Sequence, residues 1–163
     1  ELQELEEIKE ELINEGYIKG TFKNRKKNIN KTASKPHHYV STDGYHIYVG
    51  KNNKQNDELT LKFAHSNDLW LHVKDAPGSH VIVRTGARNG EITHTVIEEA
   101  ASYAAYYSNQ RQSTNVTVDF ARVKHVKKPS GAKPGMVNYS NYKSISVKPI
   151  QITNSLSWNA LHH

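Results

Sequence analysis

The side chains with the most evident binding chemistry in this sequence are the lysines of the stretch 126–139, VKKPSGAKPGMVNY. Lys127, Lys128 and Lys133 share this stretch with two prolines and two glycines. Prolines restrict a loop and glycines permit tight turns, so the stretch can hold cations at defined positions. Because an ordered loop loses less entropy on binding, this composition predicts a contact with an anionic backbone. The alternative is a solvated sheet edge, where lysines oppose aggregation.

A second group of binding side chains lies in the polar turn GKNNKQND, at 50–57. It supplies Lys51, Asn53 and Lys54. Lysines neutralise phosphates, and amides can bond phosphates or read base edges, so the turn is typical of a nucleic-acid contact. An ordinary hairpin turn would also be rich in Asn and Gly, and that alternative stays open.

A third group follows a predicted strand, where Trp70, His72 and Lys74 alternate and therefore share one face. An aromatic ring, an imidazole and a cation in one row could stack on and clamp single-stranded RNA. His80, on the next predicted strand, could add a hydrogen bond or a stacking contact. The competing interpretation places Trp70 in the core of the domain.

The distribution of charge also favours a polyanionic partner. The first 15 residues hold seven glutamates and one lysine, whereas the remainder carries 21 Lys and Arg against nine Asp and Glu. A domain this basic attracts nucleic acid over long range, with anionic lipid or acidic protein as weaker candidates. No apolar run is long enough to span a membrane, and the N-terminus is acidic rather than a basic and then apolar signal. We therefore expect a cytoplasmic protein without a membrane partner, or a fragment whose signal lies upstream.

Catalytic and metal chemistry find little support. His72 and His80 flank Asp75, but no helical His pair accompanies them, and the chain has no cysteine for a zinc–thiolate site. Ser79 and His80 are adjacent in a predicted strand and therefore point to opposite faces. We predict no catalytic residue, no metal, no cofactor and no enzyme activity; a hydrolase that uses Ser79 or His80 is the minority hypothesis.

The elements that must position these groups can be read from the periodicity of the sequence. Asp43-Gly44 between apolar alternations predicts a hairpin, and strands are expected at 68–73, 79–84, 115–126 and 143–152. A short helix is expected over 58–65, capped by Asn56 or Asp57, and a long alanine-rich helix over 93–109. A capping box from Thr95 to Glu98 is expected to start the long helix. This pattern predicts an α+β domain with a mainly antiparallel sheet, one long packed helix and a short helix.

The ends of the chain have a different composition. Leu2, Leu5, Ile8 and Leu12 form the narrow apolar stripe of a coiled-coil helix. We therefore divide the chain into the end of a coiled-coil arm (1–18), a basic linker (19–37), the α+β domain (38–152) and a disordered tail or tag remnant (153–163).

Four segments, in order, resemble one known family: GKNNKQNDELT, DLWLHVKDAPGSHVIV, EEAASYAAYYS and VKKPSGAKPGMVNY. They are similar to the NFACT-R, or RNA-binding, domain of NFACT proteins. That family includes bacterial RqcH, also described as an FbpA-like fibronectin- or fibrinogen-binding protein, and the eukaryotic NEMF group. The resemblance covers about residues 10–150. One departure is Lys51, where the family often carries arginine, and a lysine cannot make the bidentate contact that an arginine can.

The resemblance implies a C-terminal RNA- and ribosome-binding module of a ribosome-associated quality-control factor. Such factors bind obstructed large ribosomal subunits with peptidyl-tRNA and support tRNA recruitment for C-terminal alanine tailing in protein biosynthesis. The large subunit and tRNA are then the expected partners. The alternative is a fragment of a surface-exposed adhesin that binds fibronectin or fibrinogen. The residues expected to contact RNA are Lys51, Asn53, Lys54, Trp70, His72, Lys74, His80, Lys127, Lys128 and Lys133.

Overall fold

The computed structural model describes residues 34–86 and 92–149 of the 163-residue chain. The predicted coiled-coil arm, most of the basic linker and the tail lie outside the described residues. Within the described part, no helix is long and apolar enough to cross a membrane.

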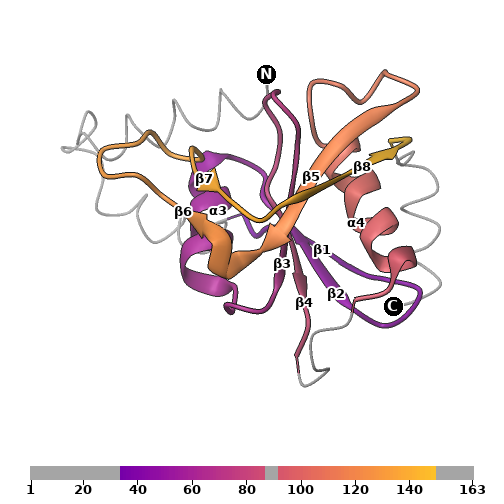
Figure 1. The fold of residues 1–163 in the computed structure, drawn as a ribbon, viewed down its shortest axis with the longest axis horizontal. Coiled ribbons are helices and arrows are strands. Elements are labelled where there is room, and N and C mark those ends of the chain that lie inside the picture. The colour runs from indigo at the N-terminus through magenta and orange to yellow at the C-terminus, as the bar shows by residue number, and fades with distance from the viewer. Residues whose placement is uncertain (1–33, 87–91, 150–163) are drawn as a thin grey trace, which may run out of the picture.

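The described chain forms an antiparallel sheet with helices on both of its faces (Figure 1). The sheet has six strands in the order β1-β2-β4-β3-β5-β8, and a separate pair is made by β6 and β7. The strands are β1 (His37–Val40), β2 (His46–Val49), β3 (Leu69–Val73), β4 (Val81–Arg84), β5 (Val116–Arg122), β6 (Val126–Lys127), β7 (Asn138–Tyr139) and β8 (Lys143–Val147). The helices are α3 (Asn53–Asp57), the π-helix η2 (Glu58–Phe63), α4 (His94–Tyr106) and the 3₁₀ turn η3 (Val123–His125).

The predicted α+β class and the antiparallel pairing are confirmed. The hairpin at Asp43-Gly44 joins β1 to β2, and Gly44 has a φ of 85°, which suits glycine in a tight turn. Trp70 of β3 pairs with Ile82 of β4 on one side and with Ala121 of β5 on the other. β3 is therefore an interior strand, and its side chains face packed layers on both sides of the sheet.

Successive side chains of each strand point to opposite faces of the sheet, so the buried residues form two separate cores. One face packs Leu69, Leu71 and Val73 against α4, whose small residues Ala100 and Ala104 let the helix approach the sheet closely. The opposite face carries a smaller cluster, which consists of Leu59, Trp70, Ile82, Val123 and Val126. Figure 1 shows α4 on one side of the sheet and α3 with the β6–β7 pair on the other.

Several predicted boundaries are corrected. The short helical segment begins at residue 53 rather than 58, because the side chain of Asn52 caps it by accepting from the Gln55 N–H at 2.9 Å. The long helix is capped by Thr93 rather than by a box from Thr95, and it ends at Tyr106.

The long strand predicted over 115–126 is also interrupted. It breaks at η3, where Val123 N–H bonds to the Asp68 carbonyl rather than to a neighbouring strand. The helical segment 53–63 closes with a wide turn, since Ala64 N–H bonds to the Leu59 carbonyl five residues earlier at 2.9 Å.

Candidate nucleic-acid interface

His80 joins the three groups of predicted binding residues. Its buried ring accepts hydrogen bonds at Nδ1 from the Trp70 indole N–H at 3.1 Å and from the Thr60 hydroxyl at 2.7 Å. Because an indole nitrogen only donates, the ring proton lies on Nε2, which donates to the Gly135 carbonyl at 2.9 Å. Burial, with a contribution from His72, lowers the pKa of His80 to about 3. His80 is therefore a neutral connector between the sheet and the loop at 127–138.

The backbone of His80 is bonded to the polar turn at 50–57. Gly50 N–H donates to the His80 carbonyl at 3.1 Å, and His80 N–H donates to the Asn56 side-chain oxygen at 3.0 Å. The Ser79 hydroxyl donates to the Gly50 carbonyl at 2.5 Å. Asn52 and Asn56 are both buried. Part of the turn expected to be exposed is therefore a helix start, and these two amides hold the protein itself together.

The lysine-rich loop consists of two consecutive tight turns, 129–132 and 133–136. In each turn the N–H of the fourth residue bonds to the carbonyl of the first, at 3.1 and 3.0 Å. The third residues, Gly131 and Gly135, have φ of 76° and 84°. A positive φ at this position is the geometry of a type II turn, which requires glycine there. The glycines of the loop thus fold it into a defined shape.

Asp57 attaches this loop to the end of α3. Its carboxylate accepts from the Gly135 N–H at 3.0 Å and lies 3.3 Å from the Lys128 ammonium. The same ammonium donates to the carbonyls of Lys133 at 2.6 Å and Met136 at 3.2 Å. Since an ammonium has three donors, Lys128 is occupied in closing its own loop.

The other lysines of the turn and the loop have more open side chains. Lys54, Lys127 and Lys133 are exposed, while Lys51 is half-buried with its ammonium 3.1 Å from the Ser34 hydroxyl. Asn53 is half-buried under the loop, where a Cβ added at Gly135 would lie 2.3 Å from its Oδ1 atom. The turn and the loop are thus packed on one another and carry the exposed lysines together.

The row along β3 lies on one face, but its members differ in access to solvent. Trp70 is buried in the smaller core, which leaves its ring no surface on which to stack a base. The centre of its ring lies 5.9 Å from that of the His72 ring. His72 is half-buried, and burial lowers its pKa. Lys74, at the end of the row, has its ammonium 3.6 Å from the Asp119 carboxylate. The structure therefore places Trp70 and His80 in the scaffold and Lys74 at the surface.

Sequence reasoning missed the acids that organise this region. Asp57 was interpreted only as a helix cap, although it binds a loop 71 residues further along the chain. Asp119 is fully buried and accepts from the hydroxyls of Tyr139 and Ser144, both at 2.6 Å. The one local signal was an aspartate in the apolar strand pattern VTVDF, since a buried carboxylate requires partners.

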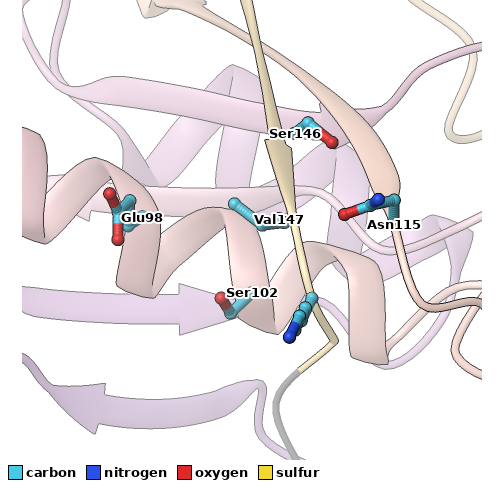
Figure 2. Close-up of a pocket in the computed structure, with 6 residues that line it drawn as sticks. Glu98, Ser102, Asn115, Ser146 and Val147 are labelled. Carbon is cyan, nitrogen blue, oxygen red and sulfur yellow. The ribbon is translucent and has the colours of Figure 1, made fainter.

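A separate pocket of about 380 Å³ lies between α4 and β8 (Figure 2). Glu98 and Ser102 line it from α4, and Ser146 and Val147 from β8. It contains one carboxylate and one ammonium, from Lys148, but no histidine to act as a base for either serine. None of the predicted binding residues lines it.

Comparison with known proteins agrees with this architecture. Residues 35–141 match the model of the NFACT protein RNA binding domain. The chain is 42% identical over 152 residues to the Rqc2 homolog RqcH of Bacillus subtilis (strain 168), which covers 90% of this chain and 25% of that protein. It is 45% identical to the Rqc2 homolog RqcH of Streptococcus suis (strain 05ZYH33), over 92% of this chain and 26% of that protein.

More distant and structural relatives extend the comparison. Coiled-coil domain-containing protein 25 of Bos taurus is 25% identical over 69% of this chain and 55% of its own length. A solved structure, the C-terminal part of the fibronectin/fibrinogen-binding protein from Streptococcus suis, superposes with a TM-score of 0.76 at 43% identity, over 96% of this chain and 60% of that one. The chain spans about a quarter of the length of the RqcH relatives. The chain belongs to the family of NFACT protein RNA binding domains.

Proposed function

We propose that this chain is the RNA-binding module of a ribosome-associated quality-control factor and acts by binding, without a catalytic residue of its own. Its family and its RqcH relatives support this assignment. In the full-length protein, the module would help to bind obstructed large ribosomal subunits with peptidyl-tRNA and to recruit tRNA for C-terminal alanine tailing. Such a role belongs in the cytoplasm.

One observation carries the proposal: the polar turn and the lysine-rich loop are bonded to each other through Asp57 and His80. Their exposed lysines are therefore presented by one ordered unit. Cations whose loop is already ordered before binding lose less entropy on contact with a phosphate backbone than cations on mobile loops. The contact residues proposed at this surface are Lys51, Asn53, Lys54, His72, Lys74, Lys127 and Lys133, with Trp70, His80 and Lys128 supporting them from within.

The test is a titration of labelled tRNA and of large ribosomal subunits with the 163-residue chain at several salt concentrations. Removal of one lysine that binds a phosphate should reduce the slope of log affinity against log salt by about one. Lys133→Ala should reduce the slope. Lys148→Ala removes an exposed lysine beside the α4 pocket and is the matched control. Affinity that does not change with salt would reject the phosphate-contact model.

A second candidate function is binding of fibronectin or fibrinogen, favoured by the name of the superposed Streptococcus suis protein. A basic surface can also hold acidic segments of matrix proteins. A binding assay with purified fibronectin and fibrinogen separates the two proposals. Binding that survives nuclease treatment would favour the adhesin, whereas binding abolished by nuclease would assign it to carried RNA.

A further inference from the structure

An aromatic side chain is displayed at the surface beyond the end of β7. Tyr142 is 44% exposed, and only three other large apolar side chains in the described ranges 34–86 and 92–149 are exposed. The Lys74 ammonium lies 5.1 Å from the centre of the Tyr142 ring, a cation–π distance. The ring of Tyr139 contacts Tyr142 at 5.0 Å and 75°. Tyr142 is therefore an exposed ring that is held by contacts with Lys74 and Tyr139.

Buried Asp119 holds the turn that carries this ring. Its two oxygens accept from the hydroxyls of Tyr139 and Ser144, which lie on either side of Tyr142 in the chain. Burial and the Asp119 hydrogen bond raise the pKa of Tyr139, so its hydroxyl keeps the proton that it donates. Between these anchors, Asn141 takes a positive φ of 49°, which a tight turn favours. The position of Tyr142 is thus set from the interior of the sheet.

The charge at this place suits a base better than a phosphate. The Asp119 carboxylate, and more weakly Tyr142 and Asp75, raise the pKa of Lys74, which stays cationic. With Asp119 at 3.6 Å and Asp75 next in sequence, carboxylates offset much of that positive charge. A phosphate would meet these carboxylates, whereas a neutral base needs only a ring surface on which to stack.

The ring is also continuous with the lysine-rich loop. Tyr139 contacts Trp70 at 4.6 Å between ring centres, and Trp70 donates to His80, which binds the loop at Gly135. The exposed loop lysines and Tyr142 are therefore attached to one scaffold of contacting residues, and we expect one RNA strand to contact both.

We propose that Tyr142, supported by Lys74, stacks on one unpaired base of the bound RNA, and that Asp119 is the residue that positions both. The inference rests on the proposed RNA-binding function and narrows it, because it names an unpaired nucleotide as the recognised element. Bases inside a duplex are already stacked on each other and present no free face to a tyrosine.

The experiment compares a single-stranded RNA that carries one 2-aminopurine with a duplex of the same length, each titrated with the 163-residue chain. Tyr142→Ala should weaken single-strand binding about 5- to 150-fold, the range of one base–aromatic stack. It should leave duplex binding and the salt slope unchanged and remove the quenching of 2-aminopurine. Tyr142→Phe keeps the ring and should retain both affinity and quenching.

A matched control is Phe63→Ala. Phe63 is an exposed ring under the Arg84 guanidinium, 4.4 Å from the ring centre, and it contacts Tyr48 at 4.7 Å. Phe63 therefore has a neighbouring cation and a neighbouring ring, as Tyr142 does. Its cation, Arg84, is the last residue of β4, whereas His80 directly precedes the first residue of that strand. Its removal should change neither RNA affinity nor quenching.

The role of Asp119 is tested by Asp119→Asn, and by Ser144→Ala should the first variant fail to fold. Either change loosens the turn without removing the Tyr142 ring, so quenching at saturating protein should fall while the salt slope stays constant. Quenching at the wild-type level in a folded variant would overturn the positioning role.

The outcomes for stacking and for RNA binding are distinguishable. If the wild type binds RNA with a salt-dependent affinity but Tyr142→Ala binds single strands equally well, or loses duplex binding equally, the stacking site is overturned and the phosphate contacts stand. If the wild type shows no salt-dependent binding of RNA, both proposals fall.

Discussion

The two faces of the sheet are held by different forces. On the α4 face, buried aliphatic and alanine side chains meet along β3, β4 and β5. On the face that carries the loop, the apolar cluster has five buried members among the described residues. There, polar contacts of His80, Asp57 and Asp119 attach the loop and the turns.

This difference separates stability from position. Burial of apolar surface is non-directional and supplies most of the favourable free energy of folding. A hydrogen bond adds little net free energy, but it fixes the distance and angle of the groups that it joins. The α4 face therefore supplies most of the stability of the domain, and the polar contacts of the loop face fix the positions of the loop and the turns.

The largest effect should come from the α4 face. Leu71 is fully buried there, and Leu71→Ala should lower the free energy of unfolding by about 2–5 kcal/mol, because it leaves a cavity. Urea denaturation measures the change. A decrease below about 1 kcal/mol would contradict the assignment of this face as the main source of stability.

The loop face should respond to backbone geometry. Gly135→Ala places a Cβ at a positive φ and 2.3 Å from Asn53 Oδ1, so we expect a decrease in stability of about 2–4 kcal/mol. Gly131→Ala is the control, since Gly131 has a similar φ with open space around it and should cost about 1–2 kcal/mol. Equal decreases in thermal or urea unfolding would show that the contact with Asn53 does not hold the loop.

Two lysines of the same loop should behave differently when their charge is removed. Lys128→Met removes the ammonium contacts with the Lys133 and Met136 carbonyls and with Asp57, and should cost about 1–3 kcal/mol in unfolding free energy. Lys133→Met removes an exposed side chain and should stay within about 0.5 kcal/mol of the wild type. The reverse order in chemical denaturation would mean that Lys128 is not the residue that closes the loop.

Acid should destabilise the loop face gradually. In the folded state the pKa of His80 is about 3, below its ordinary value of 6.5, so between these values the unfolded chain binds a proton that the folded chain does not. The contribution of His80 to the free energy of unfolding is fully present above pH 6.5. It should fall on acidification by up to about 1.4 kcal/mol per pH unit. Burial also lowers the pKa of His72, which adds to the effect in the same direction.

Urea midpoints measured from pH 7 to pH 4 test this dependence. His80→Gln should be less stable at pH 7 but show a shallower decline with acid. His94→Gln, at an exposed histidine paired with Glu98, serves as the control. An unchanged slope in His80→Gln would exclude His80 as the source of the decline.

Local sequence patterns were sufficient to predict the class of the fold and its main strands. Alternation in the segments around Trp70 and Ile82, Asp43-Gly44 between apolar runs, and the alanines of α4 are signals between near neighbours in the chain. The start of the short helix at residue 53 and the break at Val123 were missed. The helix start was missed because the cap was assigned to Asn56 or Asp57, whereas Asn52 caps the Gln55 N–H three residues later. The break depends on a contact between distant parts of the chain, the bond from Val123 N–H to the Asp68 carbonyl.

The role of each polar residue, in contrast, follows from the folded chain. Lys128 and Lys133 have the same chemistry and lie five residues apart, yet one ammonium is enclosed by carbonyls and Asp57 while the other side chain is exposed. His80 likewise became an interior connector because Trp70, Thr60 and Gly135 surround it. The two carbonyls lie five and eight residues from Lys128, but the other partners lie 10 to 71 residues away in the chain. A local pattern carries no information about which distant donor or acceptor will satisfy a buried polar group.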